Sequence, residues 1–388
     1  MTTAVNFNSE LEAIKEQGLF RELREVQGPQ GPTVVIGDRA LLNFCSNDYL
    51  GMANDKRLCD VMHGAIDRYG IGSGASPLVC GRSEAHQILE QRIAAESGRD
   101  RALVFTSGYA ANLALVTALG PGRNGRVIED RLNHASMIDG AILSRARLVR
   151  YRHADMASLE QVLSSSPDKK LVLTDAVFSM DGDIAPLQEV AALCTKYDGL
   201  LAVDDAHGYG VLGKQGTGTL SVFGLDQDAV PLLTVTFGKA IGVSGACVAG
   251  RSDLIEMLIQ KARPYIYSTA MPPALAATIT ACIEFIRADE ARRTHLYRLI
   301  NLFKNGARQL QLPVQNSDTP IQPIIVGASD EAVRISTGLL QLGILVTAIR
   351  PPTVPANSSR LRITLTAAHT EEQVNRLLEA LSVVFRKR

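Results

Sequence analysis

The sequence predicts an α/β fold in which helices flank a mostly parallel central sheet. From residue 98 to residue 239, short apolar runs alternate with amphipathic helical stretches, which is typical of strand–helix–strand crossover units. The chain has 388 residues and is therefore longer than a domain with a single hydrophobic core usually is. We therefore expect an N-terminal arm over residues 1–45, a large domain over 46–275 and a smaller α+β domain over 276–388.

The arm is expected to hold a helix and a hairpin. Residues 10–26 are rich in helix formers with apolar residues at helical spacing, and Gly18 is expected to end or kink the helix. Residues 33–36 and 41–44 are apolar runs on either side of Gly37-Asp38, which predicts a short hairpin. A helix over 56–69 should follow, between two glycine-rich loops.

The large domain is expected to contribute six strands before residue 239, at 102–105, 126–129, 148–151, 170–174, 200–204 and 232–237. Helices are expected between them at 109–119, 134–143, 158–163 and 186–197. One more strand at 246–250 and a largely helical region at 253–311 should follow, before an α+β section that ends in a helix at 370–385.

Composition excludes several classes of function. Forty basic residues balance forty acidic residues, so the chain has no net field to attract nucleic acid or an anionic membrane. The six cysteines are far apart, without the spacing of a zinc site, and we expect reduced thiols and no metal. No signal peptide and no long apolar run is found, so we expect a cytoplasmic protein.

Lys239 is the first candidate for chemistry. It follows the apolar run 232–237 and stands between Gly238 and Gly242. A buried lysine cation is costly, so a lysine at the end of a buried strand either reaches water or is held for a reaction. Most lysines after strands are solvated loop residues, and the nonapeptide alone does not decide between the two interpretations.

A candidate anion site lies at residues 106–112, between a predicted strand and an alanine-rich helix. Free backbone N–H groups and the positive helix end would meet an anion at Gly108 and Tyr109. The alternative is an ordinary helix cap at Ser107, and local sequence supports both equally.

Asp204, Asp205 and His207 follow the apolar strand at 200–204, and ligands of open α/β sheets bind at the carboxyl ends of strands. We expect Asp204 to face inward, where it needs a cationic partner. Asp205 could be a solvated charge in the loop. His207 could equally be a structural histidine. A metal site would lack a third ligand, and the match of residues 208–213 to a dinucleotide fingerprint is rejected because no helix can open at Gly213.

A phosphate cradle, an inward carboxylate and a lysine at the ends of separate strands together meet the needs of pyridoxal 5'-phosphate (PLP). They offer phosphate anchoring, a partner for the pyridinium nitrogen and an amine for a Schiff base. The chain also resembles the α-oxoamine synthases of the fold-type-I PLP-dependent transferases over nearly its whole length. The motifs that carry the resemblance are residues 46–51 (SNDYLG), 177–183 (VFSMDGD), 204–208 (DDAHG), 236–239 (TFGK), 267–269 (YST) and 347–355 (TAIRPPTVP).

The resemblance implies a role for each matching residue. Lys239 would carry the cofactor and act as acid and base, Asp204 would pair with the pyridinium nitrogen, and His134 would stack on the ring. The other implied cofactor contacts are Ser179 and His207 at the phenolic oxygen, Gly108, Tyr109 and Thr236 at the phosphate, and Ser268 and Thr269 reaching the phosphate from a second subunit of a homodimer. The implied substrate contacts are Arg21, Asn47, His134, Arg350, Thr353 and Arg362.

Within the family, the chain looks similar to the enzymes that join L-alanine to a pimeloyl thioester, with coenzyme A or acyl carrier protein as the carrier, for biotin synthesis. Sister enzymes use glycine or serine with other acyl thioesters, and nothing physical in the sequence fixes the length of an acyl pocket. A non-catalytic family member is a further alternative, which the retention of Lys239, Asp204, His207 and His134 disfavours.

Overall fold

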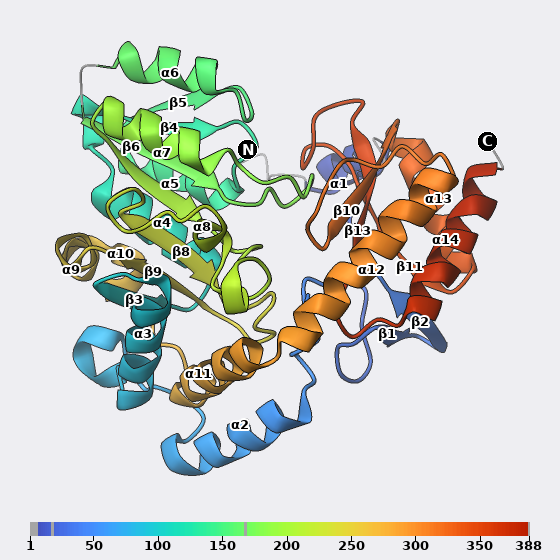
Figure 1. Ribbon diagram of the computed structural model, residues 1–388, viewed down its shortest axis with the longest axis horizontal. Helices are drawn as coiled ribbons and strands as arrows, with labels where there is room; N and C mark the ends of the chain where they lie inside the picture. The colour runs from blue at the N-terminus through green and yellow to red at the C-terminus, as the bar shows by residue number, and fades with distance from the viewer. Residues whose placement is uncertain (1–6, 17–18, 167–168, 387–388) are drawn as a thin grey trace, which may run out of the picture. The chain divides into compact units, whose positions relative to one another are not determined.

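The computed structural model describes residues 7–16, 19–166 and 169–386 (Figure 1). Its contacts form two compact units, each of which is described by itself. The sheet unit comprises Asn47–Ser179 and Asp183–Thr294, and the terminal unit comprises Met1–Ser46, Met180–Gly182 and His295–Arg388. The domain boundaries expected at residues 45 and 275 stay a prediction.

The sheet unit is built on a seven-stranded sheet in the order β3-β9-β8-β7-β6-β4-β5. Its strands are β3 (Arg101–Phe105), β4 (Gly125–Asp130), β5 (Arg147–Tyr151), β6 (Lys169–Asp175), β7 (Gly199–Asp204), β8 (Leu232–Thr236) and β9 (Ala246–Gly250). Only β9 pairs in antiparallel fashion, with β3 and β8; the remaining pairs of this described sheet are parallel. The predicted mostly parallel sheet is confirmed.

Both faces of this sheet are buried, as expected for parallel strands. Leu171 and Leu173 of β6 point into a core that α4, α5 and α9 also line, while Val172 between them is equally inaccessible on the other face. The helices of the unit are α2 (Lys56–Tyr69), α3 (Glu84–Ser97), α4 (Gly108–Leu119), α5 (Ala135–Ser144), α6 (Met156–Ser164), α7 (Leu187–Lys196), α8 (Thr219–Val222), α9 (Ser252–Lys261), α10 (Arg263–Ile266) and α11 (Pro273–Ala288). The sequence analysis missed α3.

The terminal unit holds two three-stranded sheets, in the orders β1-β2-β11 and β10-β13-β12. Their strands are β1 (Thr33–Ile36), β2 (Arg39–Asn43), β10 (Ile321–Gly327), β11 (Ile344–Leu345), β12 (Thr347–Ile349) and β13 (Ser359–Thr364). Helices α1 (Phe7–Glu16), α13 (Ser329–Gln341) and α14 (Glu371–Arg386) belong to it, and α12 (Glu290–Gln309) enters it at His295. The expected hairpin at β1 and β2 is present.

The helical prediction over residues 10–26, with an end or kink at Gly18, is wrong after Gly18. The helix ends at Glu16, residues 19–26 are not helical, and the side chain of Leu23 is fully exposed. A short helix without an apolar contact is marginal in water, because tertiary packing supplies most helical stability. The expected break at Gly18 lies outside the described residues.

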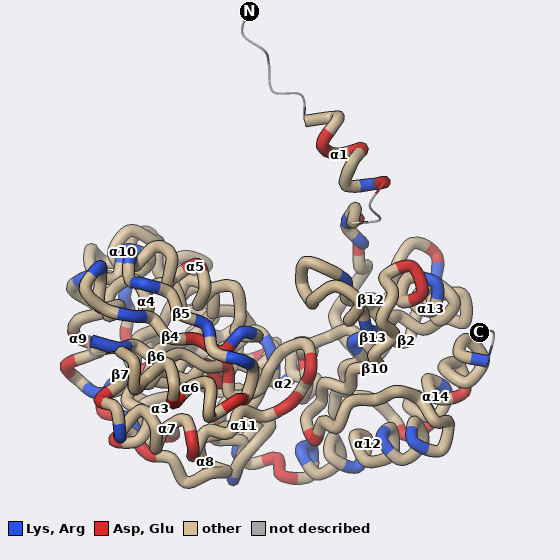
Figure 2. The backbone as a smooth tube through the Cα atoms, turned by 90° about the horizontal axis from the view of Figure 1, so that it is seen from above, with Lys and Arg blue, Asp and Glu red and all other residues tan. Residues whose placement is uncertain are grey.

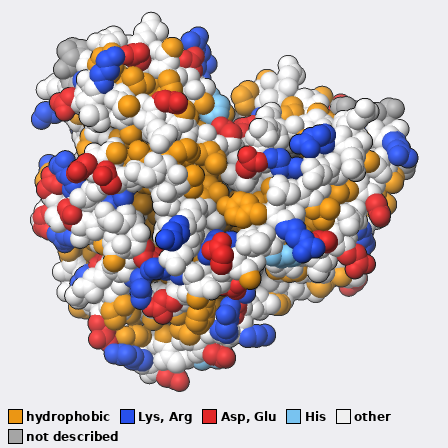
Figure 3. Space-filling view, in the orientation of Figure 1, with side chains coloured by type: hydrophobic (Ala, Val, Ile, Leu, Met, Phe, Trp, Pro, Cys, Tyr) orange, Lys and Arg blue, Asp and Glu red, His pale blue; other side chains and the backbone are white. Residues whose placement is uncertain are grey.

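Charged residues of both signs are interspersed along both units (Figure 2) and over the face of the molecule that Figure 3 shows. All six cysteines are free thiols, and three of them are buried. No helix within the described ranges is long and apolar enough to cross a membrane.

His369 joins β2 to the segment before α14. Its Nε2–H donates to the carbonyl of Asn43 at 3.0 Å, and its Nδ1 accepts the backbone N–H of Thr366 at 3.1 Å. The ring also stacks on Phe44, with 4.3 Å between ring centroids. A second proton would break the contact with Thr366, and burial lowers the pKa of His369 to about 4.

We expect His369 to make the chain sensitive to acid. Unfolded histidine binds a proton below a pH of about 6.5, whereas the folded chain resists it, so stability is full above that pH and is lost as pH falls toward about 4. His369→Gln should lower stability at neutral pH and flatten its dependence on pH across this window. Urea unfolding followed by circular dichroism measures both effects. Exposed His63→Gln is the control, and an unchanged pH dependence in His369→Gln would contradict the assignment.

Candidate functional site

A cavity of about 300 Å³ lies at the carboxyl ends of the central strands of the sheet unit. β6, β7 and β8 end at Asp175, Asp204 and Thr236, and all three residues line it. The predicted site residues that line this cavity are Asn47, Gly108, Tyr109, His134, Ser179, Asp204, His207, Thr236 and Lys239. The structure therefore brings together residues that are almost 200 positions apart in the sequence.

Lys239 is half-buried at the cavity wall, in a tight turn after β8. The turn is closed by a hydrogen bond from the N–H of Gly242 to the carbonyl of Lys239, at 2.8 Å. Gly242 has a φ of 71°, and a Cβ there would lie 2.5 Å from the backbone nitrogen of Ala53, so only glycine fits. The Lys239 amine lies 2.9 Å from Nε2 of His207.

Asp204 is buried and faces the cavity, as predicted. Its carboxylate accepts hydrogen bonds from Asn112 Nδ2 at 2.6 Å and from the N–H of Ala206 at 2.9 Å. Asn112, whose side-chain amide also contacts Ser136 Oγ at 3.0 Å, was missed by the sequence analysis. The available signal was one buried polar residue in the otherwise apolar first half of α4.

Asp175 is a second carboxylate that sequence reasoning missed. It ends β6 directly beside Asp204 in the sheet register and accepts the backbone N–H of His134 at 2.9 Å. Burial, and then the negative charge of Asp204, raise the pKa of Asp175 well above its usual range. Its position at the end of a predicted strand was the signal. No group of side chains suited to hold a metal ion occurs within the ranges that the structure describes.

Asp205 is not a solvated loop charge, and that interpretation is corrected. Only 1% of it is exposed, and it accepts the N–H and the hydroxyl of Thr219 at 2.6 and 2.5 Å. Burial raises the pKa of Asp205 to about 7. A Cβ at Gly208 would lie 2.2 Å from the same carboxylate, so the loop that carries His207 closes tightly over Asp205.

The predicted anion site lies at the start of α4. Ser107 is the N-cap, as one interpretation proposed, and its hydroxyl accepts the N–H of Ala110 at 3.1 Å. The N–H groups of the first helical turn have no intrahelical acceptor, so the cap is compatible with an anion beside Gly108 and Tyr109. A Cβ at Gly108 would lie 2.6 Å from the methyl group of Thr236, so glycine is required where these two elements meet.

The rings of His134 and Tyr109 line the same cavity. Their centroids are 6.5 Å apart, and the angle between the ring planes is 77°. His134 caps α5, where its Nδ1 accepts the N–H of Ser136 at 3.3 Å. Tyr109 donates to Asp139. The expected stacking of His134 on a cofactor ring stays a prediction.

Ser268 and Thr269 do not line the cavity of Lys239 in the described part of this chain. They border a separate space of about 20 Å³, and the preceding Tyr267 is 70% exposed. Their expected contribution to a neighbouring subunit stays a prediction.

The remaining candidates belong to the terminal unit. Arg21, Arg350 and Thr353 line one cavity of about 640 Å³, whose wall otherwise mixes apolar residues with hydroxyl and charged ones, Glu22 and Arg24 among them. Arg362 lies in β13, is 8% exposed and is not part of that wall.

The sequence of the chain is similar to those of known proteins. A family model described as aminotransferase class I and II matches residues 39–381. The 8-amino-7-oxononanoate synthase of Marinobacter nauticus is 53% identical over 97% of this chain and 95% of its own length. That of Pseudomonas fluorescens is 52% identical over 97% and 96%. The chain belongs to the aminotransferase class I and II family, on the branch of the 8-amino-7-oxononanoate synthases.

Solved structures of this family have the same fold. Serine palmitoyltransferase of Sphingomonas wittichii superposes with a TM-score of 0.92 at 31% identity, covering 98% of this chain and 96% of its own. The 8-amino-7-oxononanoate synthase of Francisella tularensis superposes with a TM-score of 0.79 at 30% identity, covering 89% and 98%. The fold-type-I PLP-dependent transferase fold is therefore confirmed.

The cofactor of this family is PLP, and the residues of the cavity fit it. The start of α4 offers N–H groups to a phosphate, and Gly108 leaves the space that a side chain would fill. The buried Asp204 faces the same cavity and suits a protonated ring nitrogen. Lys239, whose side chain carries the kind of amine that PLP requires, lines the same cavity.

We expect Gly108→Ala to weaken PLP binding at least about tenfold, because its Cβ would overlap the methyl of Thr236 and push apart the two elements at the anion site. Titration of the cofactor absorbance measures the affinity. Thr236→Ser removes that methyl, so the double variant Gly108→Ala/Thr236→Ser should recover most of the loss.

Gly64→Ala is the control, because a Cβ at Gly64 in α2 meets nothing within 4 Å. Equal weakening by Gly108→Ala in the presence and absence of the Thr236 methyl would show that the close contact does not matter.

Proposed function

We propose that the chain condenses L-alanine with a pimeloyl thioester and releases carbon dioxide, forming 8-amino-7-oxononanoate for biotin synthesis. The observation that carries this proposal is 53% identity over 97% of the chain to an enzyme of that name, together with a cavity that unites Lys239, His207 and Asp204.

Three residues are proposed to control protons in the reaction. PLP, when bound, withdraws electrons from the α-carbon of the amino acid. Asp204 keeps a proton on the ring nitrogen, since its carboxylate is buried and held by two donors. Lys239 removes the α-proton of alanine, so that this carbon can attack the thioester carbonyl, and His207 beside it bonds the phenolic oxygen. The thiol and then carbon dioxide leave, and the α-carbon takes up a proton to give the product.

The other predicted residues are proposed to bind and orient. Gly108, Tyr109 and Thr236 hold the phosphate, Ser179 bonds the phenolic oxygen and His134 covers the ring. Asn47 and Arg362 bind the carboxylate of alanine. Arg21, Arg350 and Thr353, which border one cavity with both apolar and polar walls, contact the acyl substrate. A guanidinium is the side chain best suited to a carboxylate, which a pimeloyl chain carries at its far end.

Serine palmitoyltransferase chemistry is the second candidate, because the TM-score of 0.92 to that enzyme is high. The identity is only 31%, however, compared with 53% for the M. nauticus relative. We therefore favour alanine and a pimeloyl thioester as substrates.

Product identification tests the proposal. Purified protein with PLP is given alanine, glycine or serine, each with pimeloyl, acetyl, succinyl and palmitoyl thioesters of coenzyme A or acyl carrier protein, and the products are read by mass spectrometry. We expect 8-amino-7-oxononanoate from alanine and a pimeloyl thioester. Lys239→Ala should abolish it while retaining the fold, because no other amine replaces Nζ. Exposed Lys214→Ala, the control, should retain activity. A long-chain product from serine would overturn the proposal.

We also propose that the protein is a homodimer with shared active sites. A PLP phosphate has more oxygen lone pairs than the first turn of α4 and Thr236 can satisfy. Ser268 and Thr269 are hydroxyl residues that do not line the cavity of their own chain, and the adjacent Tyr267 exposes 70% of its surface. Both observations support a role for these hydroxyls at the phosphate of a second copy.

If that role is correct, cofactor binding and dimerisation are linked. Ser268→Ala/Thr269→Val should weaken both PLP affinity and the dimer, and removal of PLP should raise the dimer dissociation constant. Analytical ultracentrifugation measures the constant, with exposed Ser164→Ala as the control. Equal constants with and without PLP would contradict the shared site.

A further inference from the structure

Tyr49 contacts the group that faces the reactive lysine. It is fully buried, and its hydroxyl lies 2.6 Å from Nδ1 of His207. The opposite ring nitrogen, Nε2, lies 2.9 Å from the Lys239 amine. The phenol of Tyr49 therefore stands behind the histidine, on the side away from Lys239, and nothing in the proposed function uses it.

One arrangement of protons satisfies the three hydrogen bonds that join Lys239, His207, Tyr49 and Asn47. When the Lys239 amine carries its proton it can only donate, so Nε2 of a neutral His207 ring accepts from it, and the ring proton then sits on Nδ1. Nδ1–H donates to the Tyr49 oxygen, which leaves the phenolic proton for Asn47 Oδ1, 3.2 Å away. All three hydrogen bonds then run in the same direction, from Lys239 to Asn47.

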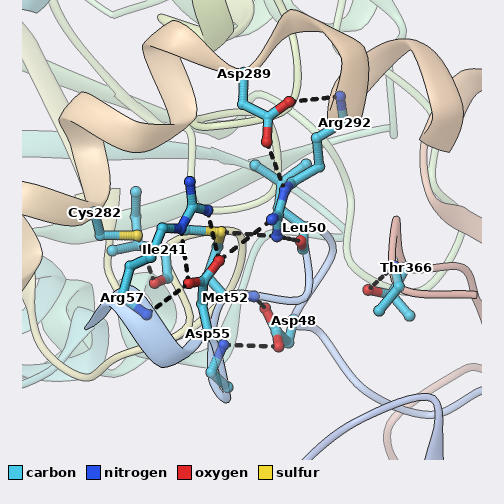
Figure 4. Close-up of polar contacts among 12 residues, drawn as sticks. Asp48, Leu50, Met52, Asp55, Arg57, Ile241, Cys282, Asp289, Arg292 and Thr366 are labelled. Carbon is cyan, nitrogen blue, oxygen red and sulfur yellow. Dashed lines mark hydrogen bonds and ion pairs between the residues drawn. The ribbon is translucent and has the colours of Figure 1, made fainter. Parts of the chain in front are cut away.

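The backbone on both sides of Tyr49 is held in place (Figure 4). Arg292 Nη1 donates to the carbonyl of Leu50 at 2.7 Å, and Asp48 accepts the N–H groups of Met52 and Ala53 at 2.7 and 3.0 Å. Arg292 is in turn oriented by Asp289 and Asp55. The phenol is thus fixed by its backbone and by burial rather than by the contact with His207 alone.

We propose that Tyr49 is a positioning residue that keeps His207 in one neutral tautomer, with Nε2 turned to Lys239. A neutral imidazole has one donor and one acceptor, and the partner of one nitrogen decides the role of the other. Removing the phenolic oxygen of Tyr49 would take away the acceptor of the buried Nδ1–H of His207. The ring proton would then move to Nε2, where it would face the donating ammonium group of Lys239. The catalytic importance of this effect rests on the proposed function, but the tautomer itself does not.

Tyr49→Phe tests the proposal, because it removes one oxygen and keeps the ring. Tyr209→Phe is the matched control: Tyr209 is 2% exposed, lies two residues after His207, and its hydroxyl donates to Glu96 at 3.1 Å, outside the cavity of Lys239. Both variants lose one buried hydroxyl, so a merely structural effect should be similar in the two.

The first readout is the tautomer of His207 in the full-length, cofactor-free chain with ¹⁵N-labelled histidine. The chain has seven histidines, and the His207 signals are those lost in His207→Asn. We expect a protonated Nδ1 in the parent protein and in Tyr209→Phe, and a protonated Nε2 or a mixture in Tyr49→Phe. Unchanged ¹⁵N shifts in Tyr49→Phe, or an equal change in Tyr209→Phe, would overturn the proposal.

The second readout is the kinetics of the PLP-loaded enzyme. We expect Tyr49→Phe to lower kcat about tenfold or more with KM for alanine within about twofold, since the loss acts on proton transfer rather than on substrate binding. A rise in KM alone would overturn the positioning role. If no protein of the series forms product, the proposed function fails, while the ¹⁵N result still decides the role of Tyr49.

Discussion

A buried negative charge at the end of β7 is the constraint on which the site depends. A carboxylate removed from water is costly unless donors or a cation replace the lost solvation. Asn112 and the backbone of Ala206 supply two donors to Asp204, and the cavity on its open side is where a cationic ring nitrogen can bind. Burial and the negative charge of Asp204 raise the pKa of Asp175, which disfavours a second negative charge beside Asp204. Of the two side chains in register, Asp204 is the one proposed to pair with the cofactor.

The adjacent Asp205 serves the loop rather than the cofactor. Asp205 accepts two hydrogen bonds from Thr219. Glycines at positions 208 and 218 let the backbone approach the carboxylate oxygens of Asp205 closely. This packing fixes the loop that carries His207, so that one ring nitrogen meets Lys239 and the other meets Tyr49. Two successive aspartates thus have separate tasks, which follow from the alternation of side chains at the end of a strand.

The sequence was sufficient to predict the parallel sheet and, among the residues at its strand ends, Asp204 and Thr236, because hydrophobic periodicity is local and strand ends converge in such sheets. It did not reveal Asn112 or Asp175, whose partners are distant in the chain: Asn112 and Asp204 are 92 positions apart, and Asp175 and His134 are 41 apart. The burial of Asp205 depends on the fold of the loop that brings Thr219 to it, which no periodic pattern predicts. The part of the helical prediction that follows Gly18 failed for another reason, because a helical pattern alone does not supply a packing surface.

Substrate choice requires a different argument from that for chemistry. A TM-score of 0.92 to serine palmitoyltransferase at 31% identity means that enzymes with different substrates can share this backbone fold. In the proposed reaction, Lys239, Asp204 and His207 act on PLP and on the proton of the α-carbon, which any amino acid substrate shares. Discrimination between acyl chains must then come from residues outside this group. The cavity that Arg21 and Arg350 border combines apolar with charged side chains, Glu22 and Arg24 among them. An acyl chain that ends in a carboxylate can contact both kinds, whereas a fatty acyl chain offers no charge to the guanidinium groups.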